Sequence, residues 1–200
     1  MATTNILHRT PATIIVALSD TTVGKVILPN PLVWVNVQTG ERADFLNEEA
    51  TSVEREALLL QYANAVNDLF PQYIGQQDWL DEPTNTAYPM LVMERLFPLP
   101  IHHFELSVRQ QMFQTFKAQF QALHDHSFVH GDFMRPTSPL NRGDREWMFA
   151  NIVQTATGLR MVDVGSARIY RKGDAELFVR ILLRERSEID FFGAYYLGDG

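Results

Sequence analysis

The chain has 200 residues, 46% apolar and 20% charged, which is the composition of an ordinary globular protein with a substantial core. The net charge of −7 disfavours a phosphate backbone as the main partner, so we expect no nucleic-acid binding. Cysteine is absent, which excludes disulfides and thiolate metal sites. No apolar run approaches the length of a membrane span, and the N-terminal residues do not have a signal-peptide pattern, so we expect a cytoplasmic protein without a transmembrane segment.

Short β-branched runs near the N-terminus predict an antiparallel sheet. Residues 13–18 and 25–28 flank a polar turn, which is the pattern of a hairpin. A third run, 33–37, alternates strictly, so its valines share one face of a strand while Trp34 and Asn36 share the other.

A capping box, Thr51-x-x-Glu54, predicts the start of a helix whose apolar residues recur at helical spacing. Glu56 falls on the inward stripe with Val53 and Leu60, so this helix would carry a carboxylate toward the core. An inward glutamate needs a partner. The alternative is a rim glutamate on a surface helix.

The middle of the chain predicts a loop, a strand and a second helix. Residues 76–86 are polar and predict the loop, and the apolar run 88–96 predicts the strand. A second capping box, Ser107-x-x-Gln110, opens the helix. Its apolar side chains recur every three or four residues and are assigned to the core: Val108, Met112, Phe116, Phe120 and Leu123.

Two further groups of polar residues are expected to have structural positions and not to form a ligand site. The histidines in His102-His103 and His124-Asp125-His126 are of a metal-ligand type, but no third ligand lies at a suitable spacing, so helix-end or loop positions are expected. Three arginines near the C-terminus have helical spacing and predict a solvated helix face: Arg180, Arg184 and Arg186.

The stretch from Phe128 to Ala167 carries the polar residues of a phosphoryl-transfer site. Such a reaction needs a carboxylate to orient or deprotonate the acceptor hydroxyl, and oxygen ligands to hold Mg²⁺ on the phosphates. Asp132 suits the first role. Asn151 and Asp163 suit the second, because Mg²⁺ prefers one or two hard oxygen ligands plus phosphate oxygens and water.

The order His130-Gly131-Asp132, then Asn151, then Asp163-Val164-Gly165 resembles the catalytic half of the protein-kinase-like superfamily, whose pattern is His-x-Asp, Asn and Asp-Phe-Gly. The His-Gly-Asp form is similar to that of aminoglycoside phosphotransferases, lipopolysaccharide-core kinases and the small atypical kinases of the RIO and Bud type. The resemblance implies a catalytic role for Asp132, metal ligation by Asn151 and Asp163, and ATP and Mg²⁺ as cofactors.

The resemblance also implies a fold. We expect an α+β, two-lobed protein-kinase-like architecture, with a small antiparallel-sheet N-lobe over residues 1–96. A mostly helical, truncated C-lobe would follow over residues 97–200, because the similar chains end soon after this point while larger kinases continue into a further helical subdomain.

The expected N-lobe departs from the family pattern at two places. Kinases have Val-Ala-Ile-Lys on the third strand, whereas here Trp34 fills the Ala place and Asn36 the place of the phosphate-binding lysine. The loop that covers the phosphates keeps only its last glycine, Gly24. Both departures favour weakened nucleotide binding.

Another residue of the chain could take the role of the phosphate-binding lysine that this pattern lacks. Lys25 could replace the missing lysine, as in kinases that take one from the preceding strand, and Glu56 would then pair with it; an exposed strand lysine is the alternative. The strand end at Met93-Glu94 resembles the linker between lobes, whose backbone binds the nucleobase. The nucleotide-binding residues implied are therefore Lys25, Glu56, Glu94 and Asn36.

The family spaces its catalytic Asp and metal Asn by four residues, whereas residues 133–150 intervene here. We expect a polar, turn-rich insertion at the substrate mouth. Placing Thr137 in the Asn position avoids the insertion but leaves Asn151 unexplained. From Asn151 to Asp163 a short hairpin, turning at Thr157-Gly158, is expected.

Three functions fit these residues. The first is an ATP-dependent kinase that phosphorylates a hydroxyl of a small molecule, a glycan or a protein. The second is a pseudokinase that serves as a binding or scaffold module with a protein partner, which the missing lysine and the decayed glycine loop favour. The third is an ATPase switch of the RIO type, which uses the same residues without an acceptor.

Overall fold

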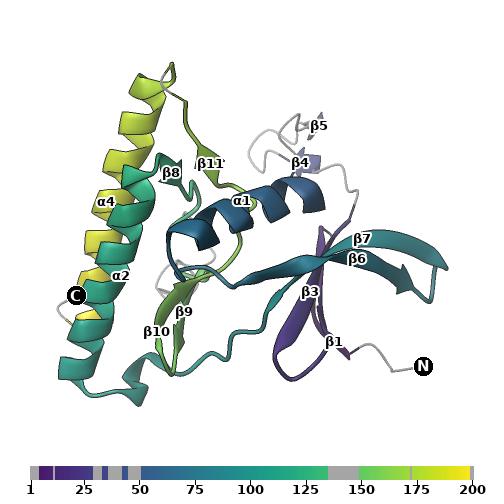
Figure 1. Ribbon diagram of the computed structural model, residues 1–200, viewed down its shortest axis with the longest axis horizontal. Helices are drawn as coiled ribbons and strands as arrows, with labels where there is room; N and C mark the ends of the chain where they lie inside the picture. Colours follow the sequence, from purple (N-terminus) through teal and green to yellow (C-terminus); the bar gives the residue numbers. More distant parts are fainter. Residues whose placement is uncertain are drawn as a thin grey trace. The chain divides into compact units, whose positions relative to one another are not determined.

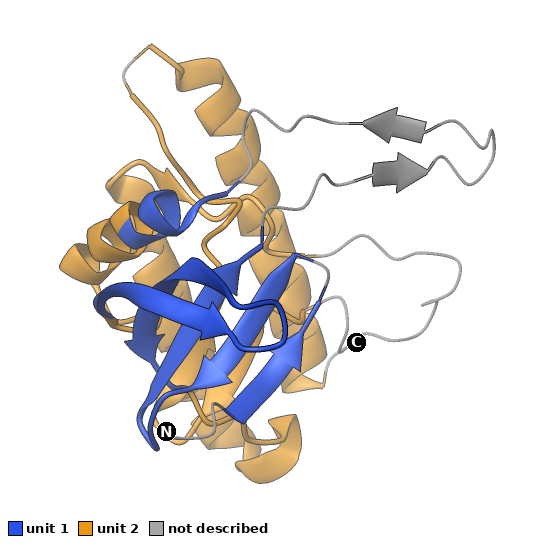
Figure 2. Cartoon of the chain, turned by 90° about the vertical axis from the view of Figure 1, so that its right-hand side faces the viewer, with its two compact units in different colours: residues 1–57, 74–95 blue, residues 58–73, 96–200 orange. Residues whose placement is uncertain are grey.

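The computed structural model describes residues 5–10, 12–28, 33–35, 42–44, 51–134, 149–171 and 173–198. The chain divides into two compact units, which Figure 2 colours separately. Unit 1 comprises residues 1–57 and 74–95, and unit 2 comprises residues 58–73 and 96–200. The expected division into lobes at residue 96 stays a prediction.

Unit 1 is built on a five-stranded antiparallel sheet with the strand order β1-β2-β3-β7-β6 (Figure 1). Its strands are β1 (Asn5–Arg9), β2 (Thr13–Ala17), β3 (Thr22–Ile27), β7 (Thr86–Glu94) and β6 (Tyr73–Asp81). The predicted hairpin is confirmed as β2–β3. Two short strands, β4 (Val33–Val35) and β5 (Arg42–Asp44), pair antiparallel with one another.

One face of the large sheet is packed with apolar side chains from four strands: Ile14, Val16, Val26, Trp79, Met90 and Val92. Successive residues of a strand point to opposite faces, so Lys25, next to Val26, lies on the other face. Gly24 belongs to the packed face, where an added Cβ would lie 2.1 Å from Met90 Sδ. Close packing therefore requires a glycine here, independently of any phosphate-binding role.

The predicted loop at residues 76–86 is wrong, because most of it is strand. Residues up to Asp81 belong to β6, and β7 begins at Thr86. β6 is an edge strand, so most of its side chains are exposed and only Trp79 and Asp81 are buried. A polar edge strand has the composition of a loop, and the alternation that marks strands is confined to its last residues.

Helix α1 (Val53–Val66) buries its predicted apolar stripe, which comprises Val53, Ala57, Leu60 and Ala63. The predicted capping residue is wrong by one position. The hydroxyl of Ser52 accepts a hydrogen bond from the backbone N–H of Arg55 at 3.1 Å. The hydroxyl of Thr51 instead donates to Glu56 Oε1 at 2.9 Å.

The described residues of unit 2 include two long helices, two small strand pairs and the second half of α1 (Figure 1). The helices are α2 (Leu106–Asp125) and α4 (Ala175–Leu197), preceded by the 3₁₀ turn η1 (Ile101–His103). Strand β8 (Phe128–Val129) pairs with β11 (Arg168–Ile169), and β9 (Ile152–Thr155) pairs with β10 (Gly158–Met161). The predicted hairpin between Asn151 and Asp163 is confirmed.

Helices α2 and α4 lie side by side through aromatic contacts. The ring centroids of Phe116 and Phe192 are 5.8 Å apart, and those of Phe120 and Phe133 are 5.4 Å apart. An added Cβ on Gly193 would lie 2.3 Å from the ring of Phe113, so this glycine allows the helices to approach closely. These aromatic rings tie the chain just beyond the His130-Gly131-Asp132 motif to both helices.

The assignment of the α2 aromatics to the core is confirmed, since Phe116, Phe120 and Leu123 are buried. The predicted start of α2 is wrong: the helix begins at Leu106, and no side chain caps it. Val108 is 39% exposed, because the first turn of α2 extends beyond the aromatic contacts. None of the described helices has both the length and the apolar composition that a membrane crossing requires.

Candidate functional site

In unit 1, Lys25 and Glu56 form a buried ion pair. Lys25 Nζ donates to Glu56 Oε1 at 2.9 Å and to Oε2 at 2.8 Å, and the side chains are only 7% and 1% exposed. The Thr51 hydroxyl adds a third hydrogen bond to the carboxylate. The alternatives of an exposed strand lysine and a rim glutamate are therefore wrong.

The turn before β3 has its own hydrogen bonds. Ser19 Oγ accepts from the backbone N–H groups of Thr21 and Thr22, both at 3.1 Å, and lies 2.7 Å from Thr22 Oγ1. Kinases of the resembled family cover the phosphates with a glycine-rich loop at this point. Here two of the backbone donors bond to a serine within the turn.

The other predicted nucleotide-binding residues have less defined surroundings. Glu94 is the last residue of β7 and is half-buried, with Thr22 as its register partner on β3. Trp34 lies on β4, where it pairs with Ala43 of β5. Asn36 lies outside the described residues. Binding of nucleotide by Lys25, Glu56, Glu94 and Asn36 stays a prediction.

In unit 2, Asn151 lies against Asp132 despite their separation in the sequence. Asn151 Nδ2 donates to the backbone oxygen of Asp132 at 2.8 Å and to Asp132 Oδ2 at 3.2 Å. Asn151 is buried, and its backbone carbonyl accepts a hydrogen bond from the N–H of Val162. The structure thus brings Asn151 to Asp132. Thr137 and most of the predicted insertion lie outside the described residues.

His130 connects this pair to Asp163. Its Nε2 donates to the backbone oxygen of Asp163 at 2.6 Å, which assigns the ring proton to Nε2 because a carbonyl only accepts. The buried ring stacks on Phe70 with a centroid distance of 5.8 Å. His130 therefore acts as a structural bridge, with its ring away from solvent.

Asp163 itself has a left-handed backbone, with φ at +62°. Its side chain is exposed, and Oδ1 accepts from the N–H of Gly165 at 3.1 Å. Aspartate is one of the few residues other than glycine that tolerates this conformation, and such strain is concentrated at functional sites. The bond from His130 and the bond to Gly165 fix where the Asp163 carboxylate lies.

Gly131 explains why the motif has glycine between the histidine and the aspartate. Its φ is +81°, and an added Cβ would lie 2.6 Å from the backbone oxygen of Ser166. Its N–H donates to Glu185 Oε1 at 2.6 Å, and its carbonyl accepts from Arg184 Nη2 at 2.7 Å. Helix α4 thus holds both sides of the residue before Asp132.

Glu185 and His124 are functional-site neighbours that the sequence reading missed. Glu185 Oε2 lies 2.8 Å from His124 Nε2, and both side chains are almost fully buried. His124 lies in the last turn of α2, as expected, but it is buried. Arg184 is largely exposed, as expected for a solvated face, but it also donates to the backbone of Gly131. The sequence alone did not single out Glu185, because the helical run 175–197 carries three glutamates, of which the structure buries Glu185 completely.

Glu188 lies one turn beyond Arg184 on α4. Burial, with the nearby carboxylates of Glu185 and Asp132, raises its pKa to about 7, although Arg184 acts in the opposite direction. The distance from Glu188 Oε1 to Arg184 Nε is 3.4 Å, and the side chain is 12% exposed. A carboxylate that titrates near neutrality therefore lies close to Asp132.

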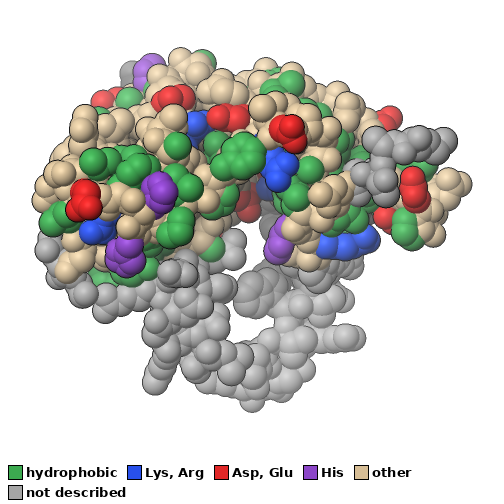
Figure 3. Space-filling view, turned by 90° about the horizontal axis from the view of Figure 1, so that it is seen from below, with side chains coloured by type: hydrophobic (Ala, Val, Ile, Leu, Met, Phe, Trp, Pro, Cys, Tyr) green, Lys and Arg blue, Asp and Glu red, His purple; other side chains and the backbone are tan. Residues whose placement is uncertain are grey.

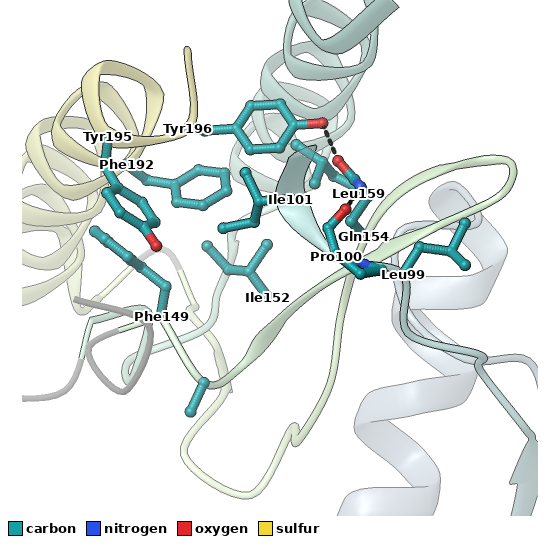
Figure 4. A pocket seen from close by; sticks show the side chains of 11 residues that line it. Leu99, Pro100, Ile101, Phe149, Ile152, Gln154, Leu159, Phe192, Tyr195 and Tyr196 are labelled. Atoms are coloured by element: carbon teal, nitrogen blue, oxygen red, sulfur yellow. Dashed lines mark hydrogen bonds between the residues drawn. The ribbon is translucent and has the colours of Figure 1, made fainter. Parts of the chain in front are cut away.

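A cavity of about 210 Å³ in unit 2 lies beside β9, the strand that follows Asn151 (Figure 4). Aromatic side chains from α4 and Phe149 line it, with Gln154 as the polar residue of its wall. Gln154 Oε1 accepts from the hydroxyl of Tyr196 at 2.6 Å, and Gln154 Nε2 donates to the backbone oxygen of Pro100. Burial raises the pKa of Tyr196 to about 12, so this tie between β9 and α4 is insensitive to pH near neutrality.

The polar residues of unit 2 fit magnesium and a phosphate-bearing ligand. Asn151 bonds Asp132 through its amide nitrogen, and its other side-chain atom, an amide oxygen, is of the type that binds Mg²⁺. Asp163 adds one exposed carboxylate. Among the described residues there is no cluster of three or more His, Asp or Glu side chains that could hold a metal alone. One carboxylate and one amide suit Mg²⁺, which completes its shell with phosphate oxygens and water.

The five-stranded antiparallel sheet and the helical second unit define a protein-kinase-like fold, as the sequence predicted. The chain is similar to the Rio2 kinase of Chaetomium thermophilum, solved as an ADP/Mg²⁺-phosphoaspartate complex, with a TM-score of 0.55 and 15% identity. The likeness covers 96% of this chain and 54% of that one, so the chain spans about half the length of the Rio2 kinase. No family model matches the sequence, and no curated protein matches it. The likeness shows the fold, and the choice among atypical kinase groups stays a prediction.

Proposed function

We propose that the protein is an ATP-dependent phosphotransferase that moves a γ-phosphoryl group to a hydroxyl group. The observation that carries this proposal is the hydrogen bonding of Asn151 to Asp132, with Asp163 joined to the same motif through His130. Hydrogen bonds within unit 2 therefore hold Asn151 against Asp132 and join the backbone of Asp163 to the same motif. These residue types suit phosphoryl transfer. Packing alone does not require a buried amide to face a carboxylate.

Each residue has a role in this proposal. Asp132 orients or deprotonates the acceptor hydroxyl, and Asn151 and Asp163 hold Mg²⁺, which neutralises charge on the phosphates when bound. Lys25, which is paired with Glu56, binds phosphate oxygens. The backbone at Glu94 binds the base, and Asn36 takes the place of the family's lysine.

A pseudokinase is the second candidate, and the turn at Ser19 favours it. Two backbone N–H groups at the position of the phosphate loop bond to Ser19 Oγ, so nucleotide binding there would cost these bonds. In that case the protein binds a protein partner through the same fold. An ATPase switch of the RIO type, which would use the same residues without an acceptor, is the third. The acceptor is a small molecule, a glycan or a protein, and we propose a cytoplasmic location.

A thermal-shift titration with ATP, with and without Mg²⁺, tests nucleotide binding. At a hundredfold excess over its dissociation constant, a ligand specific for the folded state stabilises it by about 2.7 kcal/mol. For a protein of this size we expect a rise in melting temperature of about 5 to 10 °C. Asp163→Ala should lose the Mg²⁺-dependent part of the shift.

Asp78→Ala is the matched control, because Asp78 is an exposed aspartate on the edge strand β6. It should keep the wild-type shift. If no nucleotide raises the melting temperature of the wild-type protein, the phosphotransferase and the ATPase proposals are both contradicted and the pseudokinase is favoured. A shift with ATP and Mg²⁺ would justify screening hydroxyl acceptors with radiolabelled ATP, and turnover of ATP without any acceptor would favour the switch.

A further inference from the structure

Two neighbouring residues of α4 hold the backbone on either side of Gly131. The N–H of Gly131 bonds to Glu185, which is fully buried and also bonds to His124. The carbonyl of Gly131 belongs to the peptide unit that joins it to Asp132, and it bonds to Arg184 at 2.7 Å. Arg184 therefore contacts the peptide unit that joins Gly131 to Asp132 directly.

The two holding residues differ in how firmly they are placed. Glu185 is immobilised by burial, whereas the Arg184 side chain is 54% exposed and would be free to adopt many rotamers on its own. Glu188, one turn later, restricts it through the 3.4 Å approach of Oε1 to Arg184 Nε. At 12% exposure, Glu188 has little freedom itself, so it is a fixed reference for the arginine.

Three charged groups act on Glu188 in the described part of the chain. Arg184 and Glu185 lie on its own helix, and Asp132 lies on the loop after β8. His124 of α2 bonds to Glu185. Glu188 Oε2 is buried and makes no hydrogen bond to the described residues. An ionised carboxylate in such surroundings lowers the stability of the folded protein, and residues that do so are concentrated at functional sites.

We propose that Arg184 and Glu188 are positioning residues for Asp132: Arg184 holds the Gly131–Asp132 peptide unit, and ionised Glu188 holds Arg184. This inference rests on the proposed function, because Asp132 is its catalytic residue. Neither side chain touches the reacting atoms. Their effect reaches Asp132 through one backbone carbonyl.

The arrangement makes the position of Asp132 depend on pH. Protonation of Glu188 removes its attraction for the guanidinium, which then loses its second anchor. Because burial and the neighbouring carboxylates raise the pKa of Glu188 to about 7, this change falls near neutral pH. Turnover should rise as the pH rises through this range, and at acidic pH the wild type should behave like Glu188→Gln.

The experiment has two arms on the full chain. In the first, the amide resonance of Gly131 is followed by ¹H–¹⁵N NMR between pH 5.5 and 8.5 in nucleotide-free protein. In the second, Mg²⁺-dependent ATP hydrolysis is measured over the same range for wild type, Glu188→Gln and Arg184→Gln. We expect the Gly131 resonance to titrate near pH 7 in wild type and not in Glu188→Gln.

For hydrolysis, each variant should lower kcat by about tenfold at pH 8 and leave the KM for ATP unchanged, because small displacements of a catalytic group affect turnover more than binding. The double variant should lose no more than the worse single variant, since both act through one bond. Glu176→Gln is the matched control: it breaks the exposed Glu176–Arg180 pair on the same helix and should match wild type in both arms.

Two results would overturn the inference. One is a Gly131 resonance that titrates identically in wild type and Glu188→Gln, and the other is strictly additive losses of kcat in the double variant. Failure of the proposed function is a separate result. If wild type neither binds nor hydrolyses ATP, the function is wrong, and the resonance alone decides whether Arg184 and Glu188 hold the peptide unit.

Discussion

Among individual residues, the buried charged side chains of Lys25 and Glu56 have clearly defined hydrogen-bond partners. Lys25 and Glu56 are removed from water together, and three hydrogen bonds satisfy the Glu56 carboxylate. A buried pair adds little stability in comparison with apolar residues of similar volume, but the loss of one partner leaves an uncompensated charge. We therefore infer that this pair in unit 1 serves a function, and that stability alone does not account for it.

Lys25→Met tests this explanation. It should lower the free energy of unfolding by about 3 to 5 kcal/mol, because the Glu56 carboxylate stays buried without its cation. The double variant Lys25→Met/Glu56→Leu should recover most of that loss. Both variants should lose the Mg²⁺–ATP thermal shift if Lys25 binds phosphate.

Urea unfolding followed by circular dichroism measures these differences. Lys117→Met is the control, because Lys117 forms an exposed pair with Asp190 at 2.7 Å. Its loss should cost no more than about 1 kcal/mol. A double variant as unstable as the single one would show that volume, and not charge, dominates this position.

At the scale of elements, α4 is the helix that holds the backbone of the His130-Gly131-Asp132 motif. It bonds to Gly131 through Arg184 and Glu185, and it packs against α2 through Phe192 and Gly193. One helix thus links the packed aromatic core of unit 2 to the loop that carries Asp132. Changes in α4 should reach that loop directly.

The pH dependence of the free energy of unfolding measures what it costs to bury the ionised carboxylate of Glu188. Its pKa is near 4.5 when unfolded and about 7 in the folded protein, so the folded state binds more protons between these values. Stability from this group is therefore complete below pH 4.5 and is lost as the pH rises to 7. Glu188→Gln should remove this decline.

Urea unfolding at intervals from pH 4.5 to 8 is the measurement. All other titrating groups are common to both proteins, so the difference between the two curves reports Glu188 alone. Parallel curves would show that Glu188 titrates equally in the folded and unfolded states. Glu176→Gln, on an exposed face of the same helix, should run parallel to wild type.

At the scale of the whole molecule, 24 acidic residues against 17 lysines and arginines give a net charge of −7. On the face that Figure 3 displays, acidic and basic side chains are interspersed, and the described residues form no continuous basic patch there. Binding to nucleic acid depends on clustered cations that release counterions from the phosphates.

We therefore expect no binding of single-stranded RNA or duplex DNA at physiological salt tighter than a dissociation constant of about 10⁻⁴ M, the weak end of non-specific binding. Fluorescence anisotropy with labelled 30-nucleotide probes measures it, with a basic nucleic-acid-binding protein as the positive control. Salt-dependent binding in the micromolar range would contradict the expectation.

Several elements could be predicted because their signals are local. The β2–β3 hairpin, the buried stripe of α1 and the β9–β10 hairpin each follow from residue patterns within a few turns or strand lengths. The capping prediction for α1 was wrong by one position because the adjacent Thr51 and Ser52 offer equivalent hydroxyls. The prediction for α2 was wrong because that helix begins at Leu106 without a side-chain cap. The polar strand β6 was missed because an edge strand need bury little.

By itself, the sequence determined the fold class, the inward direction of Glu56 and the types and order of the candidate catalytic residues. Only the tertiary structure decided that Lys25 meets Glu56, that Asn151 reaches Asp132, and that α4 holds Gly131. Periodicity specifies which face of an element is buried, but it contains no information about the partner that a buried polar group will find. That partner is decided by packing between distant segments, since a buried charge or amide persists only where another element supplies its hydrogen bonds.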